Sequence, residues 1–219
     1  MIDFSKYHAV IFDMDGVLID SEPLWKIAME AVFNDIGCAI TRQDFQKTVG
    51  LRIDEVVHFW FHEKGWTGYS VQEVEHRIVQ RMIDLIHQNG KPLPGVVETL
   101  ELLRKRNMKI GLATSSYSVL IDAVLNTLNI SDYFDKTHSA EHEAFGKPHP
   151  AVYLSTAQAL LVDPKHCLVV EDSFNGIVSA LAAKMEVICI PEKTHFPDSR
   201  LKIANFHFES MEEMATQLL

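Results

Sequence analysis

Helical and strand patterns alternate along the second half of this 219-residue chain, and this alternation restricts its fold more than any other feature. Amphipathic stretches are each followed by a short apolar run rich in β-branched residues. Helices are predicted at residues 96–106, 119–128, 151–161 and 174–183, and strands at 108–113, 167–170 and 187–190. Strands that alternate with helices form a parallel sheet with helices on both faces. We therefore expect an α/β fold.

The first half of the chain has a different pattern. One apolar strand is expected at residues 8–13, and helical spacing alone follows it. Helices are predicted from residue 21 to 36, from 53 to 64 and from 71 to 88, with a short helix after Thr41. Because no strand pattern interrupts these helices, we expect a helical domain at residues 20–91. It would be inserted after the first strand of a core made of residues 1–19 and 92–219.

Charge and composition limit the partners that this chain is expected to have. The formal net charge is −10, and an acidic chain is a poor general binder of nucleic acid. The apolar runs are shorter than the roughly 18 residues that a membrane helix needs. Three distant cysteines without a CxxC pair, and an N-terminus without signal-peptide features, are typical of the cytoplasm. We expect a cytoplasmic monomer that acts on a small molecule.

Chemically active residues follow the predicted strands. Asp13 and Asp15 end the first strand, Thr114 and Ser115 end the second, Lys147 precedes the helix at 151, and Glu171-Asp172 follows the strand at 167–170. Ligands of open α/β sheets bind at the carboxyl ends of the strands. Four carboxylates at one edge require a cation between them, and Mg²⁺ binds carboxylates, waters and substrate phosphates. Lys147 and the backbone N–H groups of residues 114–116 would hold the rest of a phosphorylated substrate.

The two aspartates of the first strand have different expected roles. A carboxyl group with a pKa of roughly 3.9 is ionised at neutral pH, so Asp13 can attack phosphorus without a base. Asp15 can protonate the leaving oxygen and then accept a proton from the attacking water. The metal and Lys147 would neutralise charge on the transferring group. The sequence therefore indicates phosphoryl transfer through an aspartyl-phosphate.

The same residues resemble the four motifs of the haloacid dehalogenase-like (HAD) hydrolase superfamily: Asp13-Met14-Asp15-Gly16, Thr114-Ser115, Lys147 and Glu171-Asp172. The resemblance covers nearly the whole chain and implies a HAD-like Rossmannoid core with a cap of the kind found in the β-phosphoglucomutase-like branch. Longer strings at 21–25, 50–54, 92–96, 147–150 and 171–176 are similar to phosphatases of this superfamily that act on hexitol phosphates and 2-deoxyglucose 6-phosphate.

The resemblance also implies residue roles. The catalytic residues would be Asp13, Asp15, Thr114 and Lys147. The substrate would be bound by Asp13, Met14, Asp15, Thr114, Ser115 and Lys147, with Arg52 reaching it from the cap. Mg²⁺ would be held by Asp13, Asp15 (through its backbone carbonyl) and Asp172, with Glu171 close by.

Three alternatives remain open at the level of sequence. A sugar-phosphate mutase has the same motifs, but Trp25 stands where β-phosphoglucomutases carry a histidine, which favours a phosphatase. A non-catalytic sugar-phosphate-binding module is the alternative from another functional class. Arg52 is either a substrate contact or a surface arginine that opens a helix, and Thr114 is expected to cap the following helix as well as to bind phosphate.

Overall fold

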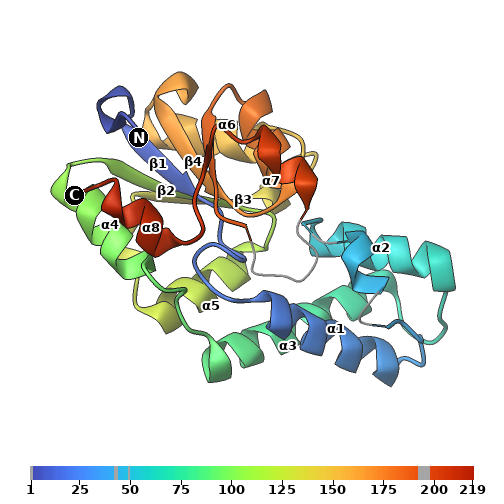
Figure 1. The fold of residues 1–219 in the computed structure, drawn as a ribbon. Coiled ribbons are helices and arrows are strands. Elements are labelled where there is room, and N and C mark those ends of the chain that lie inside the picture. The colour runs from blue at the N-terminus through green and yellow to red at the C-terminus, as the bar shows by residue number, and fades with distance from the viewer. Residues whose placement is uncertain (1, 42–43, 49, 192–197) are drawn as a thin grey trace.

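A parallel sheet, with six strands in the described part of the chain, forms the centre of the protein (Figure 1). The structure is a computed structural model that describes residues 2–41, 44–48, 50–191 and 198–219. The strand order is β3-β2-β1-β4-β5-β6. The strands are β1 (Ala9–Phe12), β2 (Lys109–Thr114), β3 (Lys136–Ser139), β4 (Cys167–Glu171), β5 (Glu186–Cys189) and β6 (Phe206–His207). The expected α/β fold is confirmed, although the two edge strands, β3 and β6, were not predicted from the sequence.

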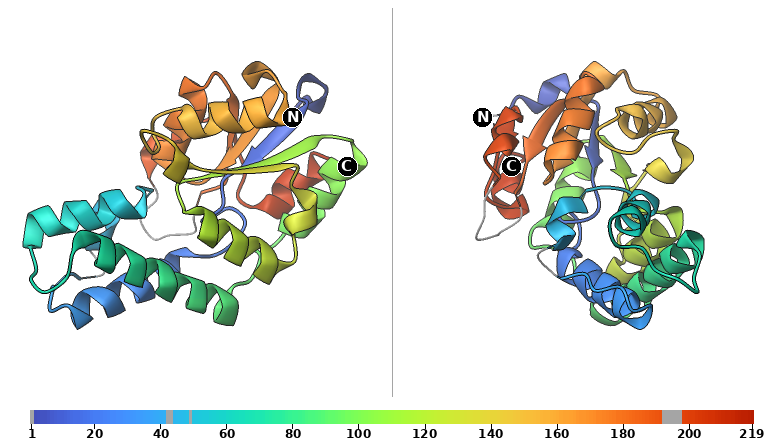
Figure 2. Two further views of the ribbon diagram at one scale, coloured as in Figure 1. Left: turned by 180° about the vertical axis from the view of Figure 1, so that it is seen from behind. Right: turned by 90° about the vertical axis from the view of Figure 1, so that its right-hand side faces the viewer.

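Helices cover both faces of this sheet (Figures 1 and 2). One face is covered by α4 (Val96–Lys105), α5 (Ser118–Leu128) and α8 (Met211–Thr216), and the other by α6 (Ala151–Leu160) and α7 (Phe174–Ala182). Side chains of a strand point alternately to the two faces. In β1, Val10 and Phe12 join the first core, while Ala9 and Ile11 join the second. Both sides of β1 are therefore buried, which explains its uninterrupted apolar run.

The remaining helices follow β1 in the chain and lie together beyond the carboxyl ends of the strands (Figure 1). They are α1 (Glu22–Asp35), α2 (Ile53–Lys64) and α3 (Val71–Asn89), with a 3₁₀ turn at Asp44–Thr48. Helix α3 packs against α1 and α2 and also against α5 of the core. We propose that residues 20–91 form the cap, with α1, α2 and α3 as the cap helices.

The chain enters and leaves the cap helices at one place. Ile19 forms an isolated antiparallel bridge with Pro92, and the Leu93 N–H donates to the Leu18 carbonyl at 3.0 Å. These two linkers therefore lie side by side at the carboxyl edge of the sheet. A pair of linkers held in this way anchors the cap helices directly above the residues that follow β1.

Short 3₁₀ turns complete the described chain, at Phe4–Lys6, Ser131–Tyr133, Ala140–His142, Pro164–His166 and Ser199–Ile203. Among the described residues, no helix is both long and apolar enough to cross a membrane.

Candidate active site

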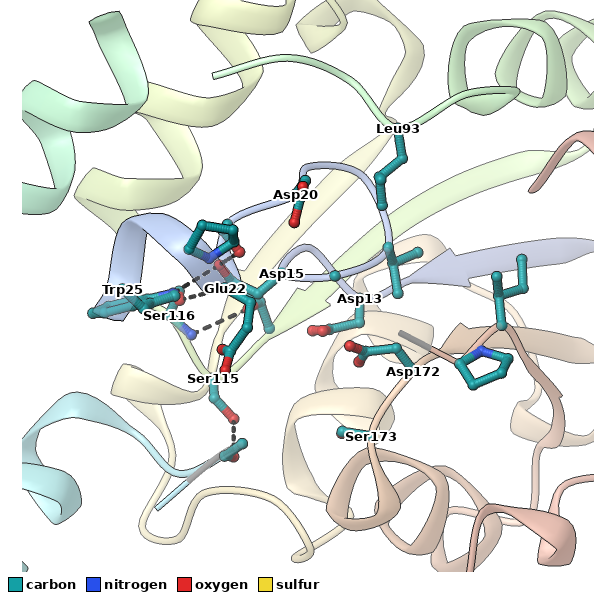
Figure 3. A pocket seen from close by; sticks show the side chains of 18 of the residues that line it. Asp13, Asp15, Asp20, Glu22, Trp25, Leu93, Ser115, Ser116, Asp172 and Ser173 are labelled. Carbon is teal, nitrogen blue, oxygen red and sulfur yellow. Dashed lines mark hydrogen bonds between the residues drawn. The ribbon is translucent and has the colours of Figure 1, made fainter. Parts of the chain in front are cut away.

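The residues that follow β1, β2 and β4 meet in one pocket between the sheet and the cap helices (Figure 3). Strand β1 lies between β2 and β4, so its first following residue, Asp13, occupies the centre of the carboxyl edge. Asp13, Asp15, Thr114, Ser115, Lys147 and Asp172 all line this pocket, whose volume is about 530 Å³. A cavity of that size suits a small metabolite.

Lys147 connects the carboxylates of Asp13 and Glu171. It lies in the loop between β3 and α6 and is only 4% exposed. Its Nζ donates to Asp13 Oδ1 at 2.8 Å, to Glu171 Oε1 at 2.7 Å and to the Ala113 carbonyl at 3.1 Å. These two carboxylates and the carbonyl help to fix the buried ammonium beside Asp13.

Tyr153 belongs to the same network and was missed by the sequence analysis. Lys147 Nζ donates to its hydroxyl at 3.0 Å, and that hydroxyl donates to Glu171 Oε1 at 2.8 Å. Tyr153 is fully buried on α6. Its one sequence signal is a phenolic hydroxyl among apolar residues six positions after Lys147, because a buried hydroxyl requires a partner.

The network holds more negative than positive charge. Burial disfavours the Lys147 ammonium, but Asp13 and Glu171 outweigh burial and hold the pKa of Lys147 above its ordinary value. Burial raises the pKa of Asp13 to about 7, although Lys147 opposes this shift. Burial also acts on Glu171, but Lys147 and several hydrogen bonds hold its pKa below the ordinary value. The two carboxylates share one cation, and Glu171 retains its charge more strongly because it has more donors.

The carboxylates of Asp13, Glu171 and Asp172 form an acidic group with ligand oxygens within 4.8 Å of one another. Glu171 Oε2 already accepts from the backbone N–H groups of Asp172 and Ser173, each at 3.0 Å. In contrast, no donor in the described part of the chain contacts the Asp172 carboxylate. Burial and the neighbouring Glu171 and Asp13 charges hold the pKa of Asp172 well above its ordinary value. A carboxylate without a positively charged partner in the protein is a suitable ligand for a hard divalent cation.

Two glycines allow this close packing of acidic groups. Gly16 has a φ of +72°, and a Cβ built there would lie 2.1 Å from Asp172 Oδ2. A Cβ on Gly176, in the first turn of α7, would lie 1.6 Å from Glu171 Oε1. Both positions exclude a side chain because a carboxylate of the acidic group occupies the space.

The carboxylate of Asp15 is held apart from this group. Ser21 and Trp25 donate to its Oδ1 at 2.6 and 3.0 Å, and Ser116 donates to its Oδ2 at 2.7 Å (Figure 3). Ser21 and the Ser116 side chain are not predicted from the sequence, because hydroxyl residues in loops have no distinct pattern.

The remaining predicted site residues near the carboxyl ends of β1 and β2 are Thr114, Ser115 and Met14. Thr114 Oγ1 accepts from the Ser116 N–H at 3.1 Å, and the residue before α5 is Tyr117, so the prediction that Thr114 caps this helix is wrong. Ser115 Oγ donates to the Gly50 carbonyl of the cap at 3.4 Å. Met14 is 1% exposed, belongs to the apolar core and is not among the residues that line the pocket, so its predicted substrate contact stays a prediction.

Arg52 opens α2, and its guanidinium contacts the core. It donates to the carbonyls of Ala140 and Glu143, both at 3.0 Å, and pairs with Asp54 at 2.9 Å. Arg52 is not among the residues that line the pocket. Its predicted substrate contact therefore stays a prediction, and its observed contacts join the cap to the core.

The walls of the pocket are of two kinds. Apolar cap residues form part of the lining, including Met29, Phe45, Ile53 and Val56. Four carboxylates from the first linker, the start of α1 and the region of α8 also line the pocket: Asp20, Glu22, Glu209 and Glu212. Such a wall combines apolar surface with acceptors for hydroxyl groups.

The chain is similar to known proteins over most of its length. The chain is 41% identical over 210 residues to hexitol phosphatase B of Escherichia coli O157:H7, with 95% of each chain covered. It is 32% identical over 180 residues to a phosphorylated carbohydrates phosphatase of Thermotoga maritima, covering 82% of this chain and 83% of the relative.

Solved structures show the same architecture. A β-phosphoglucomutase from Clostridium difficile matches with a TM-score of 0.83 and 26% identity, over 95% of this chain and 93% of that one. CbbY from Rhodobacter sphaeroides in complex with phosphate matches in fold, with a TM-score of 0.86 at 20% identity over 95% and 96% of the two chains. Residues 10–190 match the family described as haloacid dehalogenase-like hydrolase. With its parallel sheet and its motif residues gathered at one edge, the chain belongs to the haloacid dehalogenase-like hydrolase family.

Proposed function

We propose that this protein is a Mg²⁺-dependent phosphatase of small sugar or sugar-alcohol monophosphates that works through an aspartyl-phosphate on Asp13. The observation that carries the proposal is the contact of Asp13 Oδ1 with Lys147 Nζ at 2.8 Å, on the floor of a 530 Å³ pocket with Asp172 beside it. A carboxylate nucleophile next to a fixed cation suits attack on a phosphoryl group. The similarity to hexitol phosphatase B and to the phosphorylated carbohydrates phosphatase supports this substrate class.

The proposed reaction has two displacements at phosphorus. In the first, an Asp13 oxygen bonds to phosphorus, the bond from phosphorus to the sugar oxygen breaks, and Asp15 gives that oxygen a proton. In the second, water attacks phosphorus and gives its proton to Asp15, while the bond to Asp13 breaks and inorganic phosphate leaves. Lys147 and the backbone N–H groups of residues 114–116 hold the phosphoryl oxygens throughout.

Asp13 and Asp172 are the residues that we propose to hold Mg²⁺, with the backbone carbonyl of Asp15. Glu171 would contribute its charge beside the metal and would not be a main ligand, because both of its oxygens already accept hydrogen bonds. Bound Mg²⁺ supplies positive charge that lowers the pKa of Asp13 and offsets the negative charge of the phosphoryl group.

The pocket walls support a polyol monophosphate as the substrate. Asp20, Glu22 and Glu209 carry acceptors that suit sugar hydroxyl groups. The cap helices cover the carboxyl edge of the sheet, which keeps bulk water and large phosphorylated molecules away from Asp13. We therefore expect little activity on phosphoproteins or nucleic acids. A monomeric, cytoplasmic enzyme remains our expectation.

The test is phosphate release from a panel of hexose and hexitol phosphates with Mg²⁺, before and after exhaustive chelation. The proposal predicts metal-dependent release from several of them. Because the fold also matches a β-phosphoglucomutase, the products from hexose 1-phosphates should be separated as well. Conversion to hexose 6-phosphate without phosphate release would favour the mutase, whereas binding without any conversion would favour a non-catalytic module.

A further inference from the structure

The Asp15 carboxylate has donors on both of its oxygens, and those found among the described residues are all side chains. Ser21 Oγ lies 2.6 Å and Trp25 Nε1 3.0 Å from Oδ1, and Ser116 Oγ lies 2.7 Å from Oδ2. Ser21 is 1% exposed and Ser116 is 7% exposed. Figure 3 shows these contacts at the side of the pocket opposite Asp172. The orientation of this carboxylate is therefore determined by three specific groups.

The donors come from two parts of the molecule. Ser21 directly precedes α1 and Trp25 lies in its first turns, whereas Ser116 lies in the turn after β2. Asp15 thus connects the beginning of the cap to the core. A serine hydroxyl rotates freely and can also accept hydrogen bonds, but an indole N–H only donates and moves with its ring. The Trp25 ring packs against the apolar core, so its N–H has a fixed direction.

We propose that Trp25 is a positioning residue for Asp15: its indole N–H holds the carboxylate in the orientation from which a proton reaches the leaving oxygen. This inference rests on the proposed phosphatase function. Trp25 acts through Asp15 and not through contact with the sugar, although its ring lines the pocket. Loss of the N–H therefore slows proton transfer and leaves substrate binding unchanged.

The decisive variant is Trp25→Phe, which keeps an aromatic ring and removes the N–H. Positioned acid–base groups contribute about 10²–10⁴-fold to rate, so losing one of three positioning contacts should lower kcat on a sugar phosphate about tenfold or more. KM should stay within about twofold, because the substrate contacts are kept. With p-nitrophenyl phosphate the first step needs no acid, so its product should appear in a burst before a slower steady rate.

Trp66→Phe is the matched control. Trp66 Nε1 donates to the Tyr69 carbonyl at 3.2 Å, and Trp66 packs in the cap outside the pocket. The same atom is removed from the same type of residue, so kcat and KM should equal those of the wild type. If kcat falls as much in Trp66→Phe as in Trp25→Phe, the effect comes from general damage to the cap, and the inference is overturned.

A double-mutant cycle with Asp15→Asn tests whether Trp25 acts through Asp15. In the Asp15→Asn background Trp25→Phe should change kcat by less than about twofold, because the group that it positions is already lost. Equal factors in both backgrounds would mean that Trp25 works independently. If Trp25→Phe folds poorly by circular dichroism, Ser116→Ala removes the Oδ2 donor and should give the same low kcat, unchanged KM and burst.

The remaining outcomes separate the two proposals. If wild-type protein hydrolyses sugar phosphates and Trp25→Phe equals it in kcat, KM and burst, the inference fails and the phosphatase function stands. A raised KM in Trp25→Leu together with normal kinetics in Trp25→Phe would make the ring a sugar contact and would also overturn the inference. If the wild type hydrolyses no phosphate ester with Mg²⁺, both proposals fail together.

Discussion

Lys147 Nζ lies 2.8 Å from Asp13 Oδ1 and 2.7 Å from Glu171 Oε1, so one buried ammonium is shared by two carboxylates. Glu171 has further donors in Tyr153 and Ser173, whereas Asp13 has the pocket in front of it. Of these two carboxylates, Asp13 is thus the one whose charge is less satisfied within the protein. This imbalance leaves its second oxygen available to a metal or to phosphorus.

The effect of Mg²⁺ on stability should increase with pH. In metal-free protein, burial raises the pKa of Asp13 from 3.8 to about 7. Its contribution to stability is therefore fully present below pH 3.8 and is lost as pH rises through about 7, because the folded state holds the proton more tightly. Mg²⁺ requires the deprotonated carboxylate, so its binding competes with that proton. The increase in Tm caused by Mg²⁺ should be larger at about pH 8 than at about pH 6.

Asp13→Asn is the control for this pH dependence, since the variant has no carboxyl group at that position to deprotonate. Its Tm increment with Mg²⁺ should be smaller and should vary less with pH. Equal increments for the wild type at both pH values would contradict the assignment of Asp13 as a ligand.

Substitution of the two aspartates should give different kinetic failures. Asp13→Asn should be inert towards every phosphate ester, because no aspartyl-phosphate can form. Asp15→Asn should stall on sugar phosphates but should still be phosphorylated by p-nitrophenyl phosphate, whose leaving group is stable without a proton. Rapid quench should show a burst approaching one equivalent of p-nitrophenol, and intact mass should show the trapped phosphoenzyme. Unimpaired steady turnover by Asp15→Asn would remove it from the acid–base role.

Gly16→Ala should impair the metal site through Asp172. The new Cβ would lie 2.1 Å from Asp172 Oδ2, so that carboxylate must move. Gly37→Ala is a matched control, because Gly37 has a φ of +71° and nothing within 4 Å of a built Cβ. Both variants should lose roughly 1–2 kcal/mol of stability through left-handed backbone strain. Calorimetric titration should show weakened Mg²⁺ binding in Gly16→Ala alone; equal affinity in both would exclude a role for this close approach.

Arg52→Ala should affect sugar phosphates far more than p-nitrophenyl phosphate. Arg52 joins α2 to the carbonyls of Ala140 and Glu143, so its loss should loosen the cap residues that line the pocket, where we propose that the sugar binds. The matched control is Arg77→Ala, since Arg77 lies 4.4 Å from the Tyr69 ring, and neither residue lines the pocket. Steady-state kinetics on both substrates should show at least about a tenfold difference in the loss of kcat/KM for Arg52→Ala, a size typical of removing a charged contact. Equal losses on both substrates would make Arg52 purely structural.

Local sequence patterns predicted the elements whose own residues determine them. The bounds of α2 agree with the predicted ones, and those of α3 differ by one residue. Helix α3 could be predicted because its apolar spacing and a capping box at Ser70 and Glu73 are local features. Strand β3 was missed because Lys136-Thr137-His138-Ser139 is polar, and only its pairing with β2 makes it a strand. The residues of an edge strand are little buried, so they need not follow the apolar pattern that would predict a strand.

The same distinction applies to the candidate site. The gathering of Asp13, Thr114, Lys147 and Asp172 followed from the rule that parallel strands present their carboxyl ends at one edge. The contacts of Tyr153 and Trp25 did not follow, because they depend on how α6 and α1 pack against other elements. The direction of the Arg52 guanidinium likewise depends on the position of the cap relative to the core.

The central place of β1 in the sheet has a consequence for biosynthesis. Asp13 and Asp15 are synthesised before β2 and β4, but the partners of Ala9 are Lys109 in β2 and Cys167 in β4. The cap helices are synthesised before either partner and can form from local contacts, whereas the sheet must wait for distant pairings, which form slowly. A nascent chain that ends before Cys167 therefore carries both aspartates without the strand that completes their surroundings.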